Sequence, residues 1–277
     1  LAAKISRVIS RQRYDYIYSN GIELNIASLI AKIITKSHTR VICCDHTAFK
    51  AANSYYNFIR KILYRYAYKV IILTKDAQPL YENINANCSM IPHPTEMQKN
   101  SPYDKKSKIV ISVGRLDPLK QFDHLVSAWK MSNIGKIGWQ LKIFGTGGEK
   151  SKLLSLIDKD PSISLAGSSN YLALEYEKAA FAVSTSCREG MGVWLVEAQT
   201  FGLPIISYDF KSGAREIINH DAGILVELNN QEQLAKNIQK LAKNEKMRIN
   251  FSNKATLYAT RYTPDKTLLS ISKLFSL

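Results

Sequence analysis

The chain has 277 residues, 45% of them hydrophobic and 22% charged, and its 38 Lys and Arg against 23 Asp and Glu give a formal net charge of +15. This length allows one large domain or two ordinary ones, and the apolar content excludes a disordered or collagen-like chain. The charge excess indicates one of three partners: nucleic acid, an anionic membrane surface or a phosphorylated ligand.

The start of the chain lacks the features of a targeting segment or a membrane span. It begins at Leu1 rather than Met, and no signal-peptide pattern follows. The most apolar stretch, Ile22 to Ile34, is interrupted by Glu23, Asn25 and Lys32, and it is shorter than the roughly eighteen apolar residues that span a bilayer. The four cysteines form no C-x-x-C pair and no zinc-type spacing, which predicts reduced thiols. We expect a cytosolic protein whose N-terminal portion is missing from this sequence.

The first part of the chain alternates between short β-branched runs and helical patterns. This rhythm predicts a parallel sheet with crossover helices. The expected strands are Tyr14–Tyr18, Thr39–Cys44, Val70–Thr74 and Ser89–Pro92, and the expected helices are Ile22–Lys36 and Asn53–Tyr68. A polar, proline-bearing stretch follows over Pro92–Pro94 and residues 98–108, and we interpret it as an interdomain linker.

The same rhythm restarts after the linker, and six expected strands make a complete doubly wound domain. They are Ile109–Val113, Gln140–Phe144, Ile163–Leu165, Ala180–Ser184, Pro204–Ser207 and Ile224–Val226, with helices from Gln231 to Leu277. The predicted class is α/β, with two facing Rossmann-like domains. Residues 1–104 form the first domain with the linker, and residues 105–277 form the second with its C-terminal helices. We expect the first to be truncated, because it has four clear strands and lacks an opening strand with a Gly-rich turn.

The most informative motif is Ser186–Ala198, which follows a predicted strand and opens a helix. Its Gly190 and Gly192 let backbone N–H groups approach an anion, and a helix N-terminus favours negative charge. Glu189 in the loop and Glu197 about two turns into the helix are suited to accept hydrogen bonds from sugar or ribose hydroxyls. The motif predicts a nucleotide-sugar site; the alternative is a helix cap with a solvated glutamate.

Two further loops follow predicted strands of the second domain. The first carries Gly114, Arg115 and Lys120 at the carboxyl edge of the sheet, where open α/β folds bind their ligands. Two cations there can stabilise a departing diphosphate without a metal; the alternative is that both are solvated surface charges. The second loop, Phe144–Glu149, is a Gly-rich turn, for which a tight strand-to-helix connection is the simpler interpretation.

In this order and spacing, the motifs resemble those of the retaining glycosyltransferases of family 4, also called group 1, which have two Rossmann-like domains (the GT-B fold). The resemblance extends over about residues 109–226. The matching stretches are Gly114-Arg115-Leu116 with Lys120, Phe144–Gly147, Glu189–Gly192 with Glu197-Ala198 (an E-x7-E motif), Gly202–Ile206, Gly213 with Arg215–Ile218, and Gly223–Val226.

The resemblance implies roles for the matched residues. Arg115 and Lys120 would hold the donor diphosphate beside Gly114, Glu189 would contact the donor sugar, and Glu197 would bind the ribose hydroxyls. Further donor contacts are implied for Gly145, for Ser168 and Asn170 beside the base, for the backbone of Gly190, Met191 and Gly192, and for amides near Leu195 and Val196 at the distal phosphate. The family usually has Phe at Met191, and Met fills the same apolar space.

The first domain resembles the family more loosely. The stretch Val41–Thr47 ends a strand with Asp45-His46, and family members often place a His there, on the acceptor side of the cleft. His46 would orient the donor or assist deprotonation of the acceptor; the alternative is a structural hydrogen bond at a strand end. His93, at a position where Asn is usual, is interpreted as structural. The candidate catalytic residues are Glu189, His46, Arg115 and Lys120.

A basic, aromatic segment over Tyr56–Lys69 accounts for another part of the charge. It interleaves four cations, Arg60 among them, with four tyrosines. On a helix, Lys61, Arg65 and Lys69 share one face, which predicts contact with an anionic bilayer. The alternative is a solvated face with tyrosine stems packed inward. No nucleic-acid-binding motif is present, so we expect no nucleic-acid partner.

Together the motifs and the resemblance predict a retaining, metal-independent hexosyltransferase. It would move a sugar from a UDP-, GDP- or ADP-sugar to a hydroxyl of a saccharide, expected to be lipid-linked, in the assembly of bacterial surface polysaccharide such as O-antigen or capsule. We expect no cofactor and a peripheral position on the cytoplasmic face of the plasma membrane. Two alternatives stay open: a nucleotide-sugar epimerase of the same fold, and a non-catalytic module that binds a nucleotide-sugar.

Overall fold

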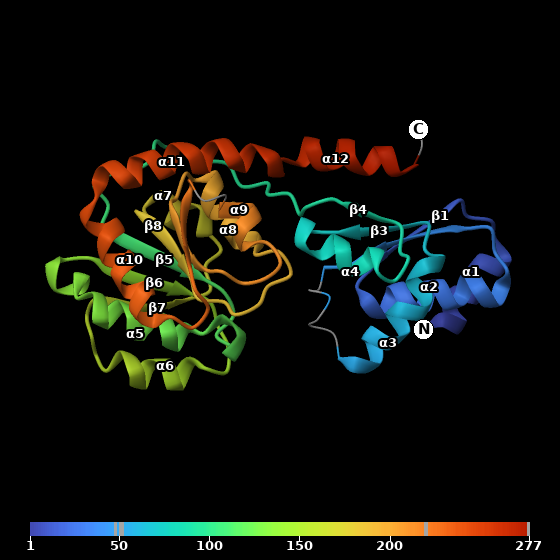
Figure 1. Ribbon diagram of the computed structural model, residues 1–277, viewed down its shortest axis with the longest axis horizontal. Coiled ribbons are helices and arrows are strands. Elements are labelled where there is room, and N and C mark those ends of the chain that lie inside the picture. Colours follow the sequence, from blue (N-terminus) through green and yellow to red (C-terminus); the bar gives the residue numbers. More distant parts are fainter. Residues whose placement is uncertain (47–48, 50–52, 219–220, 276–277) are drawn as a thin grey trace. The chain divides into compact units, whose positions relative to one another are not determined.

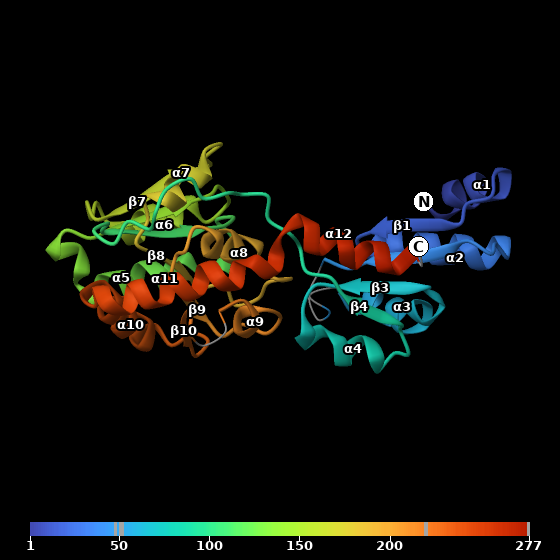
Figure 2. The same cartoon turned by 90° about the horizontal axis from the view of Figure 1, so that it is seen from above.

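The computed structural model describes residues 1–46, 49, 53–218 and 221–275, so Thr47 and Leu277 of the predicted segments lie outside the described residues. The chain divides into two compact units. The first comprises Leu1–His93, Glu189–Met191 and the residues from Asp265 onward, and the second comprises Pro94–Arg188 and Gly192–Pro264. Each unit has its own parallel sheet (Figures 1 and 2), which confirms the predicted α/β class with two Rossmann-like parts.

The first unit is built on a four-stranded parallel sheet in the order β1-β2-β3-β4. Strand residues alternate between its two faces, and one face packs against α2 and α4 through a core that includes Leu29, Val41 and Tyr81. Its elements are α1 (Ala2–Arg11), β1 (Tyr16–Asn20), α2 (Ile22–Thr35), β2 (Arg40–Cys44), α3 (Ser54–Leu63), η2 (Tyr64–Tyr66), β3 (Lys69–Ile72), η3 (Lys75–Ala77), α4 (Gln78–Glu82) and β4 (Cys88–Met90).

The helix predicted over Asn53–Tyr68 is shorter in the structure. Asn53 caps its start, because its side-chain oxygen accepts a hydrogen bond from the N–H of Tyr56 at 2.9 Å. The α-helix ends at Leu63, a single 3-10 turn follows, and Lys69 already begins β3. The prediction that Lys69 continues one helix face with the preceding cations is therefore wrong.

The second face of the first sheet is covered by the C-terminal end of the chain. Ile42 and Ile71 point to this face and pack in one cluster with Leu274, and Tyr16 packs against Phe275 with ring centroids 4.9 Å apart. Leu274 and Phe275 belong to η7 (Lys273–Phe275), which follows α12 (Pro264–Ser272). The sequence analysis assigns them to the second domain, whereas the structure groups the residues from Asp265 onward with the first unit.

The second unit has a six-stranded parallel sheet in the order β10-β9-β8-β5-β6-β7. Helices α5, α6 and α10 lie on one face, and α8 and α11 lie on the other (Figure 1). The strands are β5 (Ile109–Val113), β6 (Gln140–Phe144), β7 (Ile163–Gly167), β8 (Phe181–Ser184), β9 (Ile205–Tyr208) and β10 (Gly223–Val226). The helices are η4 (Pro118–Lys120), α5 (Phe122–Ser132), η5 (Ile134–Ile137), α6 (Lys150–Ile157), α7 (Leu172–Glu177), α8 (Val193–Thr200), α9 (Ala214–Ile218), α10 (Gln231–Lys243), α11 (Glu245–Ala259) and η6 (Thr260–Tyr262).

The predicted linker is irregular and is tied to the second unit. The hydroxyl of Tyr103 donates to the carbonyl of Ala180 at 2.6 Å, and the N–H of Asn100 donates to the carboxylate of Glu177 at 2.8 Å. Two hydrogen bonds thus fix this segment beside β8 and α7. Among the helices that the structure describes, none is both long and apolar enough to cross a membrane.

Candidate active site

The predicted donor-binding residues of the second unit follow the carboxyl ends of four neighbouring strands. Gly114 follows β5, Gly145 follows β6, Ser168 follows β7 and the motif that begins at Ser186 follows β8. Within that motif, Glu189–Met191 group with the first unit. In the sheet these strands lie in the order β8-β5-β6-β7. The strands from β5 to β7 are added on one side of β5, and those from β8 onward are added on its other side, so the strand order reverses between β5 and β8. Such a reversal is the place where open α/β sheets bind ligands. The topology therefore brings separate sequence motifs to a single edge of the sheet.

The Gly-rich turn after β6 packs directly on the loop after β5. The N–H of Leu116 donates to the carbonyl of Thr146 at 2.9 Å, and the N–H of Gly114 donates to the carbonyl of Phe144 at 2.9 Å. Gly145 has a φ of +142°, and a Cβ there would lie 1.8 Å from the carbonyl oxygen of Gly114. Gly145 thus permits the close approach of two loops, and its contact with a donor stays a prediction.

Two cations border the loop after β5. Arg115 is paired with Asp117 at 2.9 Å while 80% of its side chain remains exposed. The side chain of Lys120 crosses over Gly114, since a Cβ on that glycine would lie 3.0 Å from its Cε. Sequence reasoning missed Asp117, although its spacing of two residues from Arg115 was a signal for an ion pair. An exposed guanidinium held in place by a carboxylate is suited to bind a diphosphate.

The loop after β8 leads into α8 through Gly192. This glycine has a φ of +88°, and a Cβ there would lie 3.3 Å from the side chains of Leu195 and Phe210. Leu195 and Val196 are completely buried as whole residues, backbone included. The N–H of Leu195 already donates to the carbonyl of Gly192 at 2.9 Å. The predicted contact of these amides with a distal phosphate stays a prediction.

Glu197 is held by a tyrosine that the sequence analysis missed. The completely buried Tyr176, on α7, donates its hydroxyl to Oε2 of Glu197 at 3.1 Å. Burial, and then the charge of Glu197, raise the pKa of Tyr176 well above its ordinary value, so the hydroxyl keeps its proton. Tyr176 thereby orients the half-buried carboxylate. No local pattern around Tyr176 distinguishes it from other tyrosines, and its importance depends on the packing of α7 against α8.

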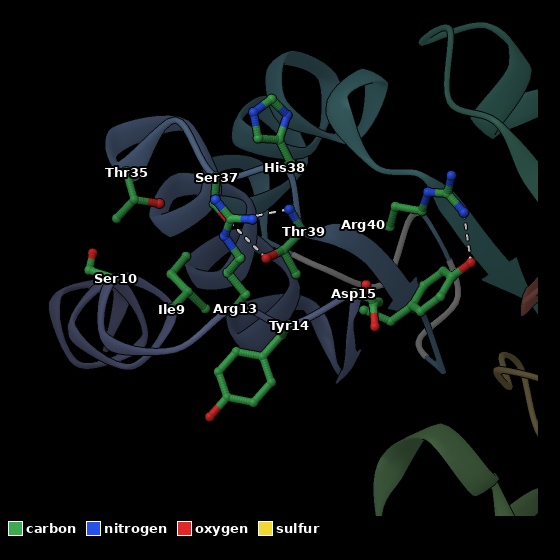
Figure 3. Close-up of a pocket in the computed structure, with 11 residues that line it drawn as sticks. Ile9, Ser10, Arg13, Tyr14, Asp15, Thr35, Ser37, His38, Thr39 and Arg40 are labelled. Carbon is green, nitrogen blue, oxygen red and sulfur yellow. Dashed lines mark hydrogen bonds between the residues drawn. The ribbon is translucent and has the colours of Figure 1, made fainter.

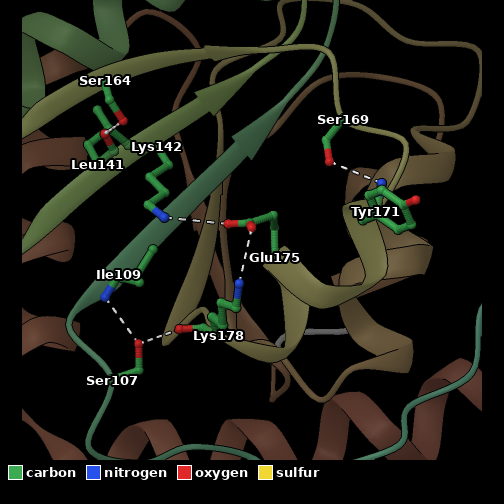
Figure 4. Close-up of polar contacts among 9 residues, drawn as sticks. All are labelled: Ser107, Ile109, Leu141, Lys142, Ser164, Ser169, Tyr171, Glu175 and Lys178. Carbon is green, nitrogen blue, oxygen red and sulfur yellow. Dashed lines mark hydrogen bonds and ion pairs between the residues drawn. The ribbon is translucent and has the colours of Figure 1, made fainter.

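Polar contacts fix α7 beside the sheet (Figure 4). Glu175 pairs with Lys142 of β6 at 3.4 Å and with Lys178 at 3.3 Å. Ser168 and Asn170 are exposed in the loop between β7 and this anchored helix. Their predicted contact with the base of a nucleotide stays a prediction, but the loop that carries them begins and ends at fixed elements.

In the first unit, His46 lies just after β2 and is half-buried. Its Nε2 is 3.5 Å from the sulfur of Cys44, and its ring centroid is 5.7 Å from that of His93. Burial, and then the neighbouring His93, lower the pKa of His46. The ring is therefore neutral at neutral pH, a form that can accept a hydrogen bond or a proton.

Directly before His46 lies a buried ion pair that the sequence analysis did not anticipate. Asp45 and Arg60 are 3.2 Å apart, and both side chains are 0% exposed. The hydroxyl of Tyr81 donates to the same carboxylate oxygen at 2.6 Å, and the guanidinium stacks over the ring of Phe49 at 4.5 Å. The assignment of Arg60 to a basic surface is therefore wrong, because its charge is neutralised inside the unit.

A pocket of about 1020 Å³ lies at the amino ends of β1 and β2 in the first unit (Figure 3). Arg13, Asp15, His38 and Arg40 line it, and Arg40 donates to the hydroxyl of Tyr16 at 2.8 Å. His46, in contrast, follows the carboxyl end of β2, which is the end where parallel sheets bind their ligands. The pocket and His46 therefore lie at opposite ends of the strand. None of the predicted site residues lines it.

Comparison with known proteins identifies one family over most of the second unit. Residues 94–258 match the family described as glycosyl transferases group 1. The amylovoran biosynthesis glycosyltransferase AmsD of Erwinia amylovora is 29% identical over 258 residues, which cover 89% of this chain and 73% of that protein.

Two further likenesses extend over both units. The N-acetylgalactosamine-N,N'-diacetylbacillosaminyl-diphospho-undecaprenol 4-alpha-N-acetylgalactosaminyltransferase of Campylobacter jejuni is 26% identical over 257 residues, covering 86% of this chain and 70% of that protein. The crystal structure of Anabaena HepE in complex with UDP and glucose has a TM-score of 0.84 and 19% identity, and the match covers 100% of this chain and 81% of that one. The chain thus spans part of the length of each relative and has the same fold as HepE.

Proposed function

The chain belongs to the glycosyl transferases of group 1, and from that membership we propose that it moves a hexosyl group from a nucleoside diphosphate sugar to a hydroxyl of a lipid-linked saccharide. The observation that carries the proposal is that Gly114, Arg115 and Lys120 follow β5 at the carboxyl edge of the six-stranded sheet, beside its reversal in strand order. The start of the loop after β8 lies against them, because the N–H of Cys187 donates to the carbonyl of Leu119 at 2.9 Å. The named activities of the relatives support an acceptor in bacterial surface polysaccharide biosynthesis, and UDP in HepE makes UDP-sugars the first donors to test.

Each donor contact in this proposal follows from the chemistry of its residue. Arg115 and Lys120 neutralise the diphosphate, because both are cations beside the same loop. Glu197, oriented by Tyr176, accepts hydrogen bonds from the ribose hydroxyls. Glu189 accepts hydrogen bonds from the hydroxyls of the hexose. Gly145, Ser168 and Asn170, the backbone of residues 190–192 and the amides of Leu195 and Val196 complete the proposed set.

The proposed reaction is a front-face substitution with retention at the anomeric carbon, as in family 4. The bond between C1 and the diphosphate oxygen breaks while the acceptor oxygen forms its bond to C1 on the same face. The acceptor proton passes to the departing diphosphate, whose charge Arg115 and Lys120 stabilise without a metal. His46, as a neutral imidazole, orients the donor sugar or accepts the acceptor proton transiently. The protein would act as a peripheral protein on the cytoplasmic face of the membrane.

A donor panel tests the proposal. UDP-, GDP- and ADP-sugars are compared by thermal shift, since a ligand well above its Kd raises the melting temperature. Glu197→Ala should weaken binding of the preferred donor roughly ten- to a hundred-fold, as expected for lost hydrogen bonds to a charged group. Glu232→Ala, an exposed glutamate on α10, is the matched control. Unchanged affinity of Glu197→Ala would remove the site assignment.

Transfer itself is then measured with the preferred donor and a lipid-linked saccharide. NMR of the product should show the anomeric configuration of the donor. Binding without transfer or hydrolysis would contradict an enzyme, and conversion of the donor to an epimer without an acceptor would contradict a transferase.

A further inference from the structure

Helix α3 and the turn that follows it expose a stripe of large apolar side chains. Tyr55, Phe58, Ile62 and Tyr66 are 66%, 64%, 40% and 51% exposed. Their spacing of three, four and four residues places them on one side of the helix. Single exposed apolar residues are common on protein surfaces, but a continuous stripe of this kind indicates an interaction surface.

The orientation of this stripe is fixed from the opposite side of the helix. Arg60 is completely buried in its ion pair with Asp45, and Tyr64 is completely buried in the core of the first unit. Both residues anchor the helix against α2, α4 and the sheet. The helix therefore cannot turn its apolar stripe inward without breaking a buried charge pair. Tyr64, one of the four tyrosines of the basic, aromatic segment, belongs to this anchor.

Cations lie directly beside the stripe. Lys61 and Arg65 are exposed one helical turn apart, and together with Asn83 and Asn85 they line a pocket of about 520 Å³. In the part of the chain that the structure describes, neither cation forms an ion pair with an acidic side chain. The sequence between Asp45 and Asp76 contains no acidic residue at all. The surface is thus positive, with amide donors around the pocket.

We propose that this surface, the α3 patch (Tyr55, Phe58, Lys61, Ile62, Arg65 and Tyr66), docks on an anionic phospholipid bilayer. The aromatic and aliphatic side chains enter the interface between headgroups and acyl chains, where amphipathic rings are stable. Lys61 and Arg65 pair with lipid phosphates, and the pocket beside them accepts one headgroup. Nucleic acid would match the two charges but would leave Phe58 and Ile62 without an apolar partner. The inference adds a partner surface to the proposed function and does not rest on the reaction.

Co-sedimentation with vesicles tests the α3 patch. The whole chain is mixed with vesicles of phosphatidylcholine alone or with phosphatidylglycerol, without donor or acceptor. Binding should require the anionic lipid and should weaken as salt shortens the Debye length. Lys61→Gln with Arg65→Gln should weaken partitioning about twenty-five-fold, since each cation near an anionic leaflet contributes about five-fold. The matched control is Lys236→Gln with Lys240→Gln, two exposed lysines with the same spacing on α10.

The apolar side chains of the α3 patch are tested separately from its cations. Phe58→Ser should weaken partitioning roughly ten-fold or more, because an aromatic side chain loses its burial in the interface. Leu257→Ser, which is 59% exposed on α11, should have no effect. In a second measurement, brominated lipids should quench the tryptophan emission of Phe58→Trp and leave that of Leu257→Trp unchanged.

Three results of the vesicle experiments would overturn the proposal. They are equal binding of the wild type to neutral and anionic vesicles, wild-type partitioning of the Lys61 and Arg65 variant, and absence of quenching in Phe58→Trp. Tight binding to RNA with no binding to vesicles would likewise overturn it and assign the cations to nucleic acid. Because no sugar transfer is measured, failure here is distinguishable from failure of the proposed reaction.

Discussion

Replacing Arg60 by Met tests the buried ion pair of the first unit. Methionine keeps an apolar stem but removes the guanidinium, which lies 3.2 Å from Asp45 and 4.5 Å from the ring of Phe49. The carboxylate of Asp45 is then left without its cation at a position with 0% exposure. Breaking a buried pair by removing one partner costs roughly 3–5 kcal/mol. That is a large part of the free energy of unfolding of a typical domain, about 5–15 kcal/mol.

The surroundings of Asp45 indicate the lower end of this range. The hydroxyls of Tyr81 and Tyr64 donate to the carboxylate at 2.6 and 3.4 Å and remain in the variant. We therefore expect a loss of about 3 kcal/mol. The double variant Asp45→Asn with Arg60→Met should recover most of this loss, because replacing both members of a buried pair is often neutral. Arg65→Met, an exposed arginine beside the same helix, should change stability by less than about 0.5 kcal/mol.

Urea denaturation followed by two probes measures the effect. All three tryptophans, Trp129, Trp139 and Trp194, lie in the second unit, so their emission reports that unit, while far-UV circular dichroism reports both. With a typical slope, a loss of about 3 kcal/mol lowers the midpoint of the first unit by roughly 1–3 M urea. A midpoint shift no larger than that of Arg65→Met would refute the reasoning. So would a double variant that is less stable than Arg60→Met alone.

Three further predictions follow from the two units. Tyr176→Phe removes the hydroxyl that orients Glu197, so donor affinity in calorimetry should fall about two- to ten-fold; unchanged affinity would argue against an orienting role. Gly145→Ala forces a Cβ within 1.8 Å of a backbone carbonyl and should lower the melting temperature, whereas Gly148→Ala meets nothing within 4 Å and should match the wild type; equal melting temperatures for the two variants would contradict this. Because burial lowers the pKa of His46, the folded protein favours the neutral ring, so stability should fall as the pH drops through the ordinary histidine value near 6.5 toward the lowered pKa. The rate of transfer should fall only as the pH drops through the lowered pKa itself, where the ring of the folded protein gains its proton, and His46→Asn should lack this acid limb.

The bounds of some strands could be predicted from the sequence, because their apolar residues stand out from the polar residues on either side. Strands Ile109–Val113 and Gln140–Phe144 have the predicted bounds. The first is mostly β-branched, and the second alternates polar Gln140 and Lys142 with buried Leu141 and Ile143. The family prediction is confirmed at the level of group 1, because residues 94–258 match that family. Helix α1 (Ala2–Arg11) was not predicted, although its Ile5, Val8 and Ile9 have the spacing of one helix face.

The predictions that were wrong or missing depend on contacts between residues far apart in the sequence. Arg60 looked like a surface charge because arginine is rarely buried without a partner. Its partner Asp45 directly follows β2, Tyr81 lies on α4 and Phe49 lies between β2 and α3, and only the fold brings these residues together. The pairing of Tyr176 with Glu197 likewise joins α7 to α8 over 21 residues. A basic segment could thus be recognised from its composition, but not which of its charges faces solvent.

The return of the C-terminal residues to the first sheet has a consequence for synthesis on the ribosome. The four strands that the structure describes in that sheet are made by Met90, but Leu274, which covers Ile42 and Ile71, is made about 184 residues later. At the usual 5–20 residues per second, the intervening part of the chain takes roughly 10–40 s to translate. During that time the nascent first unit presents an uncovered apolar face, which is a substrate for chaperones and a site of aggregation. Slow translation should therefore lower the yield of folded protein more than it would for a chain whose units are each completed in sequence.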